Sequence, residues 1–214
     1  MTSLRRFPAL PALSLVALLL TAGCAAGQTA PAEISSYGSS AWKGTPVTSG
    51  YPLPEQEFTD TTGRTVVPAR DAGAPTTLVF FGYTRCPDIC NIVLANIAAA
   101  MRGLPQSVRD DTRLLFVSTD PARDTRAVVR EYLDRFDPSY VGLVAPVETV
   151  ELAARALHIS YERPDGSTGG YEVEHGAYTT GFVDGEARVV WAEDVSVADM
   201  RADILRLVKL ARLA

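Results

Sequence analysis

The chain has 214 residues, of which 47% are hydrophobic and 21% are charged. This length and composition fit one globular domain with a hydrophobic core and short appendages. The formal net charge of −5 argues against a nucleic-acid partner, because proteins that bind nucleic acids present basic surfaces to the phosphates.

Residues 1–23 are expected to be an export signal and not part of the fold. Arg5 and Arg6 form a basic start, and an apolar run from Leu10 to Leu20 follows. The run is shorter than the ~20 residues that a membrane-spanning helix needs. A short apolar run behind basic residues is typical of a secretory signal.

The residues around the expected cleavage site resemble a bacterial lipoprotein signal, in which the cysteine after the cut is lipidated. Small residues precede Cys24, although Thr21 stands where such signals usually have Leu. In this interpretation Cys24 carries the lipid and anchors the protein to the cell membrane, on the side facing away from the cytoplasm. The alternative is an ordinary signal-peptidase site after Ala22 or Ala26.

Residues 24–50 are expected to be a flexible linker, and residues 51–214 the folded domain. The linker stretch is rich in Ala, Ser, Gly, Thr and Pro and has no sustained apolar period. Such a segment spans roughly 25–30 Å on average. It would hold the domain off the membrane, or it is a leader without a role of its own.

Apolar patterns and turn residues predict the elements of the domain in chain order. We expect a hairpin at 57–67, a strand at 76–81, a helix at 88–102, a strand at 114–118, a helix from Asp124 or Thr125 to Phe136, a strand at 141–144 and a helix at 148–157. The strand at 76–81 contains the apolar run from Leu78 to Phe81, and the strand at 114–118 is apolar up to Ser118, as in a parallel sheet that is covered on both faces.

The last third of the chain has a different pattern. Residues 158–161 are expected to be extended, and a turn-rich loop at 163–170 with a return at 171–174 would form an inserted hairpin. Strands at 177–183 and 187–191 flank Asp184-Gly185, a strong hairpin signal, and a helix follows at 197–213. Parallel βαβ units followed by an antiparallel pair and a helix predict an α/β, thioredoxin-like fold.

Cys86 and Cys90 stand where the strand at 76–81 ends and the helix at 88–102 begins. Residues four apart share one face of a helix, and a helix N-terminus lowers a thiol pKa. Two thiolates on one face can form a redox pair or provide two soft metal ligands. The third interpretation is a structural disulfide, but so short a loop contributes only roughly 2 kcal/mol in the chain-entropy model.

Three blocks of the sequence resemble the Sco/SenC family of thioredoxin-like copper chaperones for cytochrome c oxidase assembly. They are FFGYTRCPDIC at 80–90, FVSTDPARDT at 116–125, and EHGAY at 174–178 followed by FVD at 182–184. Arg85 stands where His is common in the family, and Asn91 where a second Pro is common. The resemblance covers about 53–213, and it implies a copper site formed by Cys86, Cys90 and His175.

The remaining candidates have structural interpretations. Of the two histidines, His158 follows an apolar helical run and is expected to be packed or hydrogen-bonded. Asp88 is expected to be a helix N-terminal charge, and Asp120 and Asp124 loop or capping residues. The aromatic residues Tyr83 and Trp191 are expected in the core or the wall of the site.

The favoured function is a membrane-tethered copper chaperone that delivers copper to the dinuclear copper site of cytochrome c oxidase. A thiol reductant is implied, because the pair would oxidise to a disulfide in an exported protein. The alternative is a thiol–disulfide reductase that keeps oxidase cysteines reduced, so whether the chain is an enzyme stays open. A peroxidase is a weaker third possibility. A reductase needs only the cysteines, whereas the copper site also needs His175.

Overall fold

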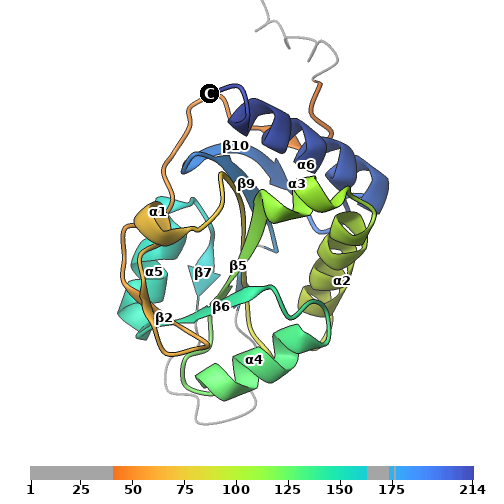
Figure 1. Cartoon of the computed structure of the whole chain (residues 1–214). Coiled ribbons are helices and arrows are strands. Elements are labelled where there is room, and N and C mark those ends of the chain that lie inside the picture. Colours follow the sequence, from red (N-terminus) through yellow and green to blue (C-terminus); the bar gives the residue numbers. More distant parts are fainter. Residues whose placement is uncertain (1–40, 163–173, 176) are drawn as a thin grey trace, which may run out of the picture. The chain divides into compact units, whose positions relative to one another are not determined.

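The computed structural model describes residues 41–162, 174–175 and 177–214, within a compact unit that extends from Ser39 to Ala214. Within these residues the main sheet has the order β1-β10-β9-β4-β5-β6-β2-β3 (Figure 1). Its strands are β1 (Thr45–Pro46), β2 (Phe58–Asp60), β3 (Thr65–Val66), β4 (Thr76–Gly82), β5 (Thr112–Ser118), β6 (Val141–Val144), β9 (Thr179–Val183) and β10 (Glu186–Trp191). A separate pair joins β7 (Tyr161–Glu162) and β8 (Glu174–His175).

The centre of the sheet is parallel, and the strands outside it are antiparallel. β4 pairs in parallel with β5, and β5 with β6, while β9 runs antiparallel along the other edge of β4. Every residue of β4 is buried, which explains the uninterrupted apolar run from Leu78 to Phe81 within this strand. The parallel core with the antiparallel β9–β10 pair confirms the predicted thioredoxin-like α/β fold.

Helices cover both faces of the sheet (Figure 1). They are α1 (Pro68–Asp71), α2 (Ile89–Arg102), α3 (Gln106–Asp110), α4 (Arg126–Asp134), α5 (Val147–Ala156) and α6 (Val197–Ala211). Among the described residues, none of these helices is long and apolar enough to cross a membrane.

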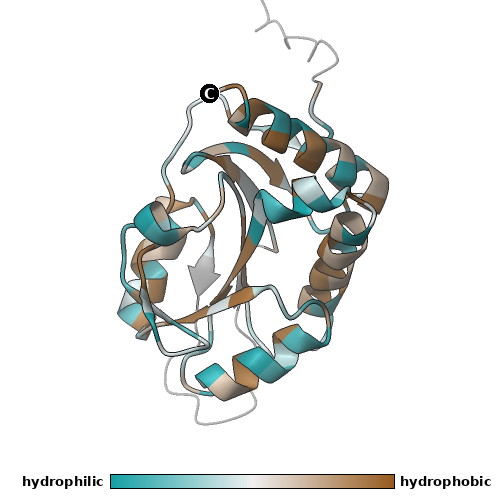
Figure 2. Ribbon diagram, viewed as in Figure 1, coloured by the Kyte–Doolittle hydropathy of each residue, from teal (hydrophilic) through white to brown (hydrophobic). Residues whose placement is uncertain are grey.

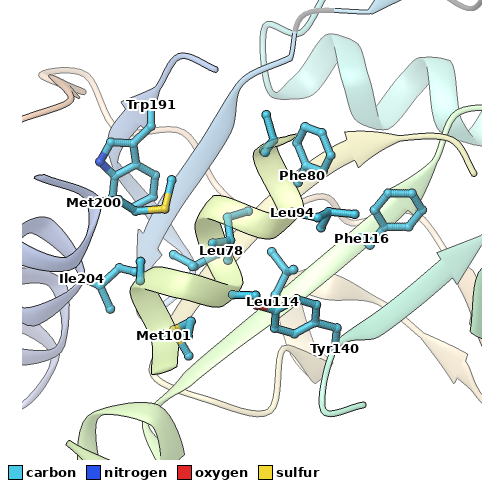
Figure 3. Packing of buried hydrophobic residues seen from close by; sticks show 14 of the residues in the cluster. Leu78, Phe80, Leu94, Met101, Leu114, Phe116, Tyr140, Trp191, Met200 and Ile204 are labelled. Carbon is cyan, nitrogen blue, oxygen red and sulfur yellow. The ribbon is translucent and has the colours of Figure 1, made fainter. Parts of the chain in front are cut away.

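Side chains that alternate along the central strands form two hydrophobic clusters. Leu78 and Phe80 of β4 pack with α2, α4 and α6 on one face, whereas Val79 and Phe81 pack with α5 on the other. Figure 3 shows the first cluster, with Leu94 of α2 among side chains from the sheet and α6. The helices carry their apolar residues on the side that meets the sheet and polar residues outside (Figure 2). The burial of both faces fixes the register of β4 and therefore the position of its end.

The hairpin predicted at Asp184-Gly185 is confirmed. Both turn residues have positive φ, 48° and 82°, as a tight turn between twisted strands requires. The predicted inserted hairpin is present as the antiparallel pairing of β7 and β8, in which Tyr161 faces His175. Its expected tip at 163–170 lies outside the described residues.

The structure corrects the C-terminal end of the expected linker. Residues 41–50 include β1, which pairs with β10. The amides of Lys43 and Gly44 donate to the buried carboxylate of Asp203 at 2.9 and 2.8 Å, and Trp191 Nε1 donates to it at 2.9 Å. The stretch from Lys43 onward therefore belongs to the folded domain, and residues 24–40 of the expected linker lie outside the described residues.

Candidate metal centre

The two cysteines lie together between the carboxyl end of β4 and the first turn of α2. Cys86 retains 7% of its surface and Cys90 none, and both are thiols. The amide of Cys90 donates to Cys86 Sγ at 3.4 Å, and the amide of Cys86 donates to the carbonyl of Tyr83 at 3.2 Å. The sequence-predicted juxtaposition of the two sulfurs is therefore present.

The sulfur of Cys86 satisfies an amide that the start of a helix leaves without an intrahelical acceptor. Asp88 occupies the N-cap position of α2, but among the described residues its side chain caps no backbone amide. Asp88 is exposed, in keeping with its interpretation as an N-terminal charge. The capping acceptor at this helix start is thus Cys86 Sγ.

The pKa lowering that we expected from the helix N-terminus does not hold for Cys90. The hydrogen bond with Cys86 and burial raise the pKa of the Cys90 thiol, and the charge of Asp124 adds to the increase. An amide hydrogen bond from Tyr83 opposes these effects without cancelling them. The hydrogen bond with Cys86 and burial both favour the protonated form of the buried Cys90 thiol, and a soft cation that binds there would displace the proton.

Gly82 provides the room that Cys90 occupies at the end of β4. A Cβ atom at this position would lie 3.2 Å from Cys90 Sγ and 3.0 Å from ring atoms of Phe80 and Phe116. All of these neighbours are fixed in the core, so a larger residue would press directly on the sulfur. The close approach of the backbone explains the small residue between the strand and the cysteine loop.

Asp124 ties the cysteine loop to the loop that follows β5. Its carboxylate is buried and accepts hydrogen bonds from the amide and the hydroxyl of Thr84, at 3.0 and 2.6 Å, and from the hydroxyl of Ser118 at 2.7 Å. The amide of Thr119 donates to the carbonyl of Gly82 at 2.8 Å. Two segments about forty residues apart are thereby joined beside the sulfurs.

Asp120 and Asp124 lie in the loop between β5 and α4, as expected, but neither of them caps α4. Both are buried, and Asp120 forms an ion pair with Arg123, whose guanidinium lies 6.0 Å from the ring centre of Tyr83. The helix cap of α4 is Thr125, whose hydroxyl accepts from the amide of Val128.

Tyr132 supports the cysteine helix from α4. Its hydroxyl donates to the side-chain oxygen of Asn91 at 3.1 Å. Burial raises the pKa of Tyr132, and the nearby Cys90 and Cys86 add to this effect. Asn91, one of the two positions at which the chain differs from the common family pattern, therefore attaches α2 to α4.

The remaining predicted residues are placed only in part. His175 lies in β8, and nothing further is described of its side chain. His158 is exposed, has a φ of 56° and meets the ring of Tyr51 edge-on at 5.2 Å, so it is less packed than expected. Tyr83 and Trp191 are buried, as predicted. Cys24 lies outside the described residues.

Sequence reasoning missed the role of Asp124 because aspartate near a helix start is a common cap. The one sequence signal was the serine at the end of an apolar strand, followed at short distance by two aspartates. Its meaning depends on which other loop lies beside it, and that is a property of the folded sheet.

Comparisons with known proteins agree with this geometry. Protein SenC of Rhodobacter capsulatus is 39% identical over 100 residues, and the match covers 47% of this chain and 44% of SenC. This chain therefore spans less than half the length of that relative.

Solved structures match over most of the domain. Apo Sco1 from Thermus thermophilus has a TM-score of 0.70 and 29% identity, covering 78% of this chain and 96% of that one. Bradyrhizobium japonicum ScoI, solved with copper bound, has a TM-score of 0.63 and 28% identity, covering 77% of this chain and 98% of that one. The SCO1/SenC family model matches residues 53–209, and the chain belongs to the SCO1/SenC family.

Proposed function

We propose that this protein is a copper chaperone that holds copper at Cys86, Cys90 and His175 and passes it to the dinuclear copper site of cytochrome c oxidase. The observation that carries the proposal is the pair of adjacent thiols at the start of α2, joined by the hydrogen bond from the Cys90 amide to Cys86 Sγ. Thiolates are soft ligands that select Cu(I), and imidazole suits copper in either oxidation state. The donor set therefore fits copper.

The sheet register supports the choice of His175 as the third ligand. Thr179, four residues after His175, pairs with Phe80 of β4, and Phe80 lies two residues before Gly82. Four extended residues span at most about 14 Å, so the backbone of His175 stays close to the strand end that carries the cysteine loop.

Copper would leave the site by ligand exchange with soft ligands of the acceptor. Cys86 is the sulfur with residual exposure, while Cys90 has none, so an acceptor ligand would reach the metal from the side of Cys86. Copper in the 28% identical ScoI structure supports copper as the cargo. That acceptor is proposed to be the copper-binding subunit of cytochrome c oxidase, in line with the family to which the chain belongs.

A second candidate function is a thiol–disulfide reductase, and the adjacency of Cys86 and Cys90 favours it. One cysteine would attack a disulfide of the partner and the other would resolve the mixed disulfide. The pair then gives two electrons and two protons, so Cys86 and Cys90 end as a disulfide and the partner as a dithiol. An external thiol reductant would have to restore the pair, and the chaperone needs the same reductant.

The histidines separate the two functions. Replacing His175 with Asn removes one of three copper ligands, and we expect copper affinity to fall by about tenfold or more, with the rate of thiol–disulfide exchange changed by less than about threefold. His158→Asn is the matched control, because Asn tolerates positive φ and keeps the conformation seen at His158. Copper affinity by chelator competition and exchange rate are measured side by side.

A chain in which His175→Asn binds both Cu(I) and Cu(II) as tightly as the wild type would contradict the ligand assignment. The cysteine pair would then act alone, and the reductase function would take first place. A comparable loss of affinity in His158→Asn would show that the effect is not specific to the site.

The proposal includes a lipid anchor at Cys24, on the membrane face directed away from the cytoplasm. Cys24→Ser removes the acceptor for the lipid, so we expect the processed protein to move from the membrane fraction to the soluble fraction. Fractionation of cells that express each form is the measurement, with the copper-site variant His175→Asn as a control that stays in the membrane. Unchanged membrane association of a correctly processed Cys24→Ser protein would contradict the lipoprotein interpretation.

A further inference from the structure

The carboxylate of Asp124 accepts hydrogen bonds from β5 and the cysteine loop, and it does not cap α4, the helix that follows it. Thr84 provides two donors and Ser118 a third, while the cap of α4 comes from Thr125. Asp124 retains 1% of its surface. Burial raises its pKa, against the effect of the hydrogen bonds from Thr84 and Ser118.

Burying a carboxylate costs free energy that hydrogen bonds only partly offset. Apolar residues of similar volume often stabilise a protein as well as a buried charged group does. A buried carboxylate that joins two loops therefore indicates that the conformation of these loops matters for function.

The place in question is the start of the cysteine loop. Thr84 precedes Cys86 by two residues, and the carbonyl of Tyr83, the residue directly before Thr84, accepts the Cys86 amide at 3.2 Å. The backbone of Gly82, directly before Tyr83, is held by the Thr119 amide at 2.8 Å. Two contacts from the loop after β5 thus hold the chain between β4 and Cys86: Thr119 with Gly82, and Asp124 with Thr84. The Asp124–Thr84 contact is the nearer of the two to Cys86 in the sequence.

We propose that Asp124 is a positioning residue, which holds the two sulfurs of Cys86 and Cys90 in one arrangement by binding Thr84. This rests on the proposed function, in that the arrangement is the one that receives copper. Without the Asp124–Thr84 contact the cysteine loop samples other conformations. Copper binding then has to order the loop, which lowers the copper affinity. Groups that orient metal ligands from behind typically change metal affinity by about 10- to 100-fold when removed.

The test uses the reduced full-length chain in a Cys24→Ser background with Cu(I) as the probe, in competition with a chromophoric chelator under anaerobic conditions. Asp124→Ala removes the carboxylate, and Thr84→Val removes the hydroxyl while it keeps the backbone donor and the shape of the side chain. We expect both to lower Cu(I) affinity, Asp124→Ala by about 10- to 100-fold. Thr84→Ser restores the hydroxyl and should stay within about threefold of the wild type, since the donor is kept.

Asp203→Asn is the matched control for stability. Asp203 is equally buried and accepts hydrogen bonds from Lys43, Gly44 and Trp191, and none of these three residues belongs to the cysteine loop. It should reduce the stability of the fold and leave Cu(I) affinity within about threefold of the wild type, because additivity holds for independent sites.

A second readout is the equilibrium of the Cys86–Cys90 dithiol and disulfide against glutathione. A variant that only weakens the fold would leave this equilibrium unchanged, whereas a loosened loop should shift it together with copper affinity. Thr84→Val keeps the Asp124 carboxylate and its hydrogen bond from the Thr84 amide. This variant therefore still tests the proposal if Asp124→Ala does not fold.

Wild-type affinity and an unchanged dithiol equilibrium in folded Asp124→Ala or Thr84→Val would overturn the proposal, as would an equal loss of affinity in Asp203→Asn. A wild-type chain that binds no copper would instead overturn the proposed function. In that case the role of Asp124 is decided by the dithiol equilibrium alone.

Discussion

The two cysteines differ in exposure and therefore in the order in which they can react. Cys86 keeps a little surface, and Cys90 has none and carries a raised pKa, chiefly from its hydrogen bond with Cys86 and from burial. An incoming soft cation or a partner thiol meets Cys86 first. Cys90 follows when its proton is displaced, so copper uptake should release protons.

At the scale of single residues, the cysteine pair could be predicted from the sequence and Asp124 could not. Spacing and a following helix are local facts, and they were sufficient to place Cys86 beside Cys90. Asp124 and Thr125 are both good helix caps by residue type. Which one caps α4 is decided by Thr84, which reaches Asp124 only after β4 and β5 have paired.

At the scale of elements, long apolar segments and strands next to a clear turn signal were predictable, and short segments without such a signal were not. β4 and β5 each contain an uninterrupted run of apolar residues, and α2 has apolar residues at helical spacing over its whole length. β1 has two residues and exists only through its pairing with β10. The helices α1 and α3, with four and five residues, were not predicted, because so short a segment shows no helical period.

The β2–β3 hairpin provides a prediction about pH that belongs to this scale. Asp60 accepts hydrogen bonds from the amides of Thr62 and Arg64 at 2.8 and 3.0 Å. Burial acts to raise its pKa, but the hydrogen bonds from Thr62 and Arg64 outweigh burial and lower it to about 2. The carboxylate therefore stabilises the fold above its unfolded-state pKa of about 3.9, and this stabilisation is lost as the pH falls toward about 2.

We expect Asp60→Asn to lower the free energy of unfolding by about 2 kcal/mol at pH 7, and by progressively less as the pH falls below about 4. Urea unfolding of both proteins across this range is the measurement. Asp134→Asn, which removes a half-exposed partner of Arg130, is the control and should cost about 0–1 kcal/mol. A difference between wild type and Asp60→Asn that stays constant down to pH 2 would contradict the assignment.

At the scale of the whole molecule, the candidate site depends on segments that are distant in sequence. The cysteine loop follows β4, its support follows β5, and His175 lies before β9, which pairs with the other edge of β4. The sequence predicted the order of these elements, and the resemblance indicated the third ligand. The contacts across the loops could not be predicted because they arise from strand neighbours, which the chain order alone does not specify.

The central claim is that Cys86, Cys90 and His175 together bind copper. Its most direct test is an anaerobic titration of the reduced chain with Cu(I), with copper counted per chain and its ligands identified by X-ray absorption. The titration uses a Cys24→Ser background, because Cys24 would otherwise offer a third thiol in the unprocessed chain.

We expect one copper ion per chain, bound by two sulfur atoms and one imidazole nitrogen, with stoichiometric binding lost in Cys86→Ser and in Cys90→Ser. Oxidation of the pair to a disulfide should abolish binding in the same way, because both sulfur ligands are consumed. Copper binding that persists unchanged when either cysteine is replaced, or a reduced chain that takes up no copper, would contradict the account.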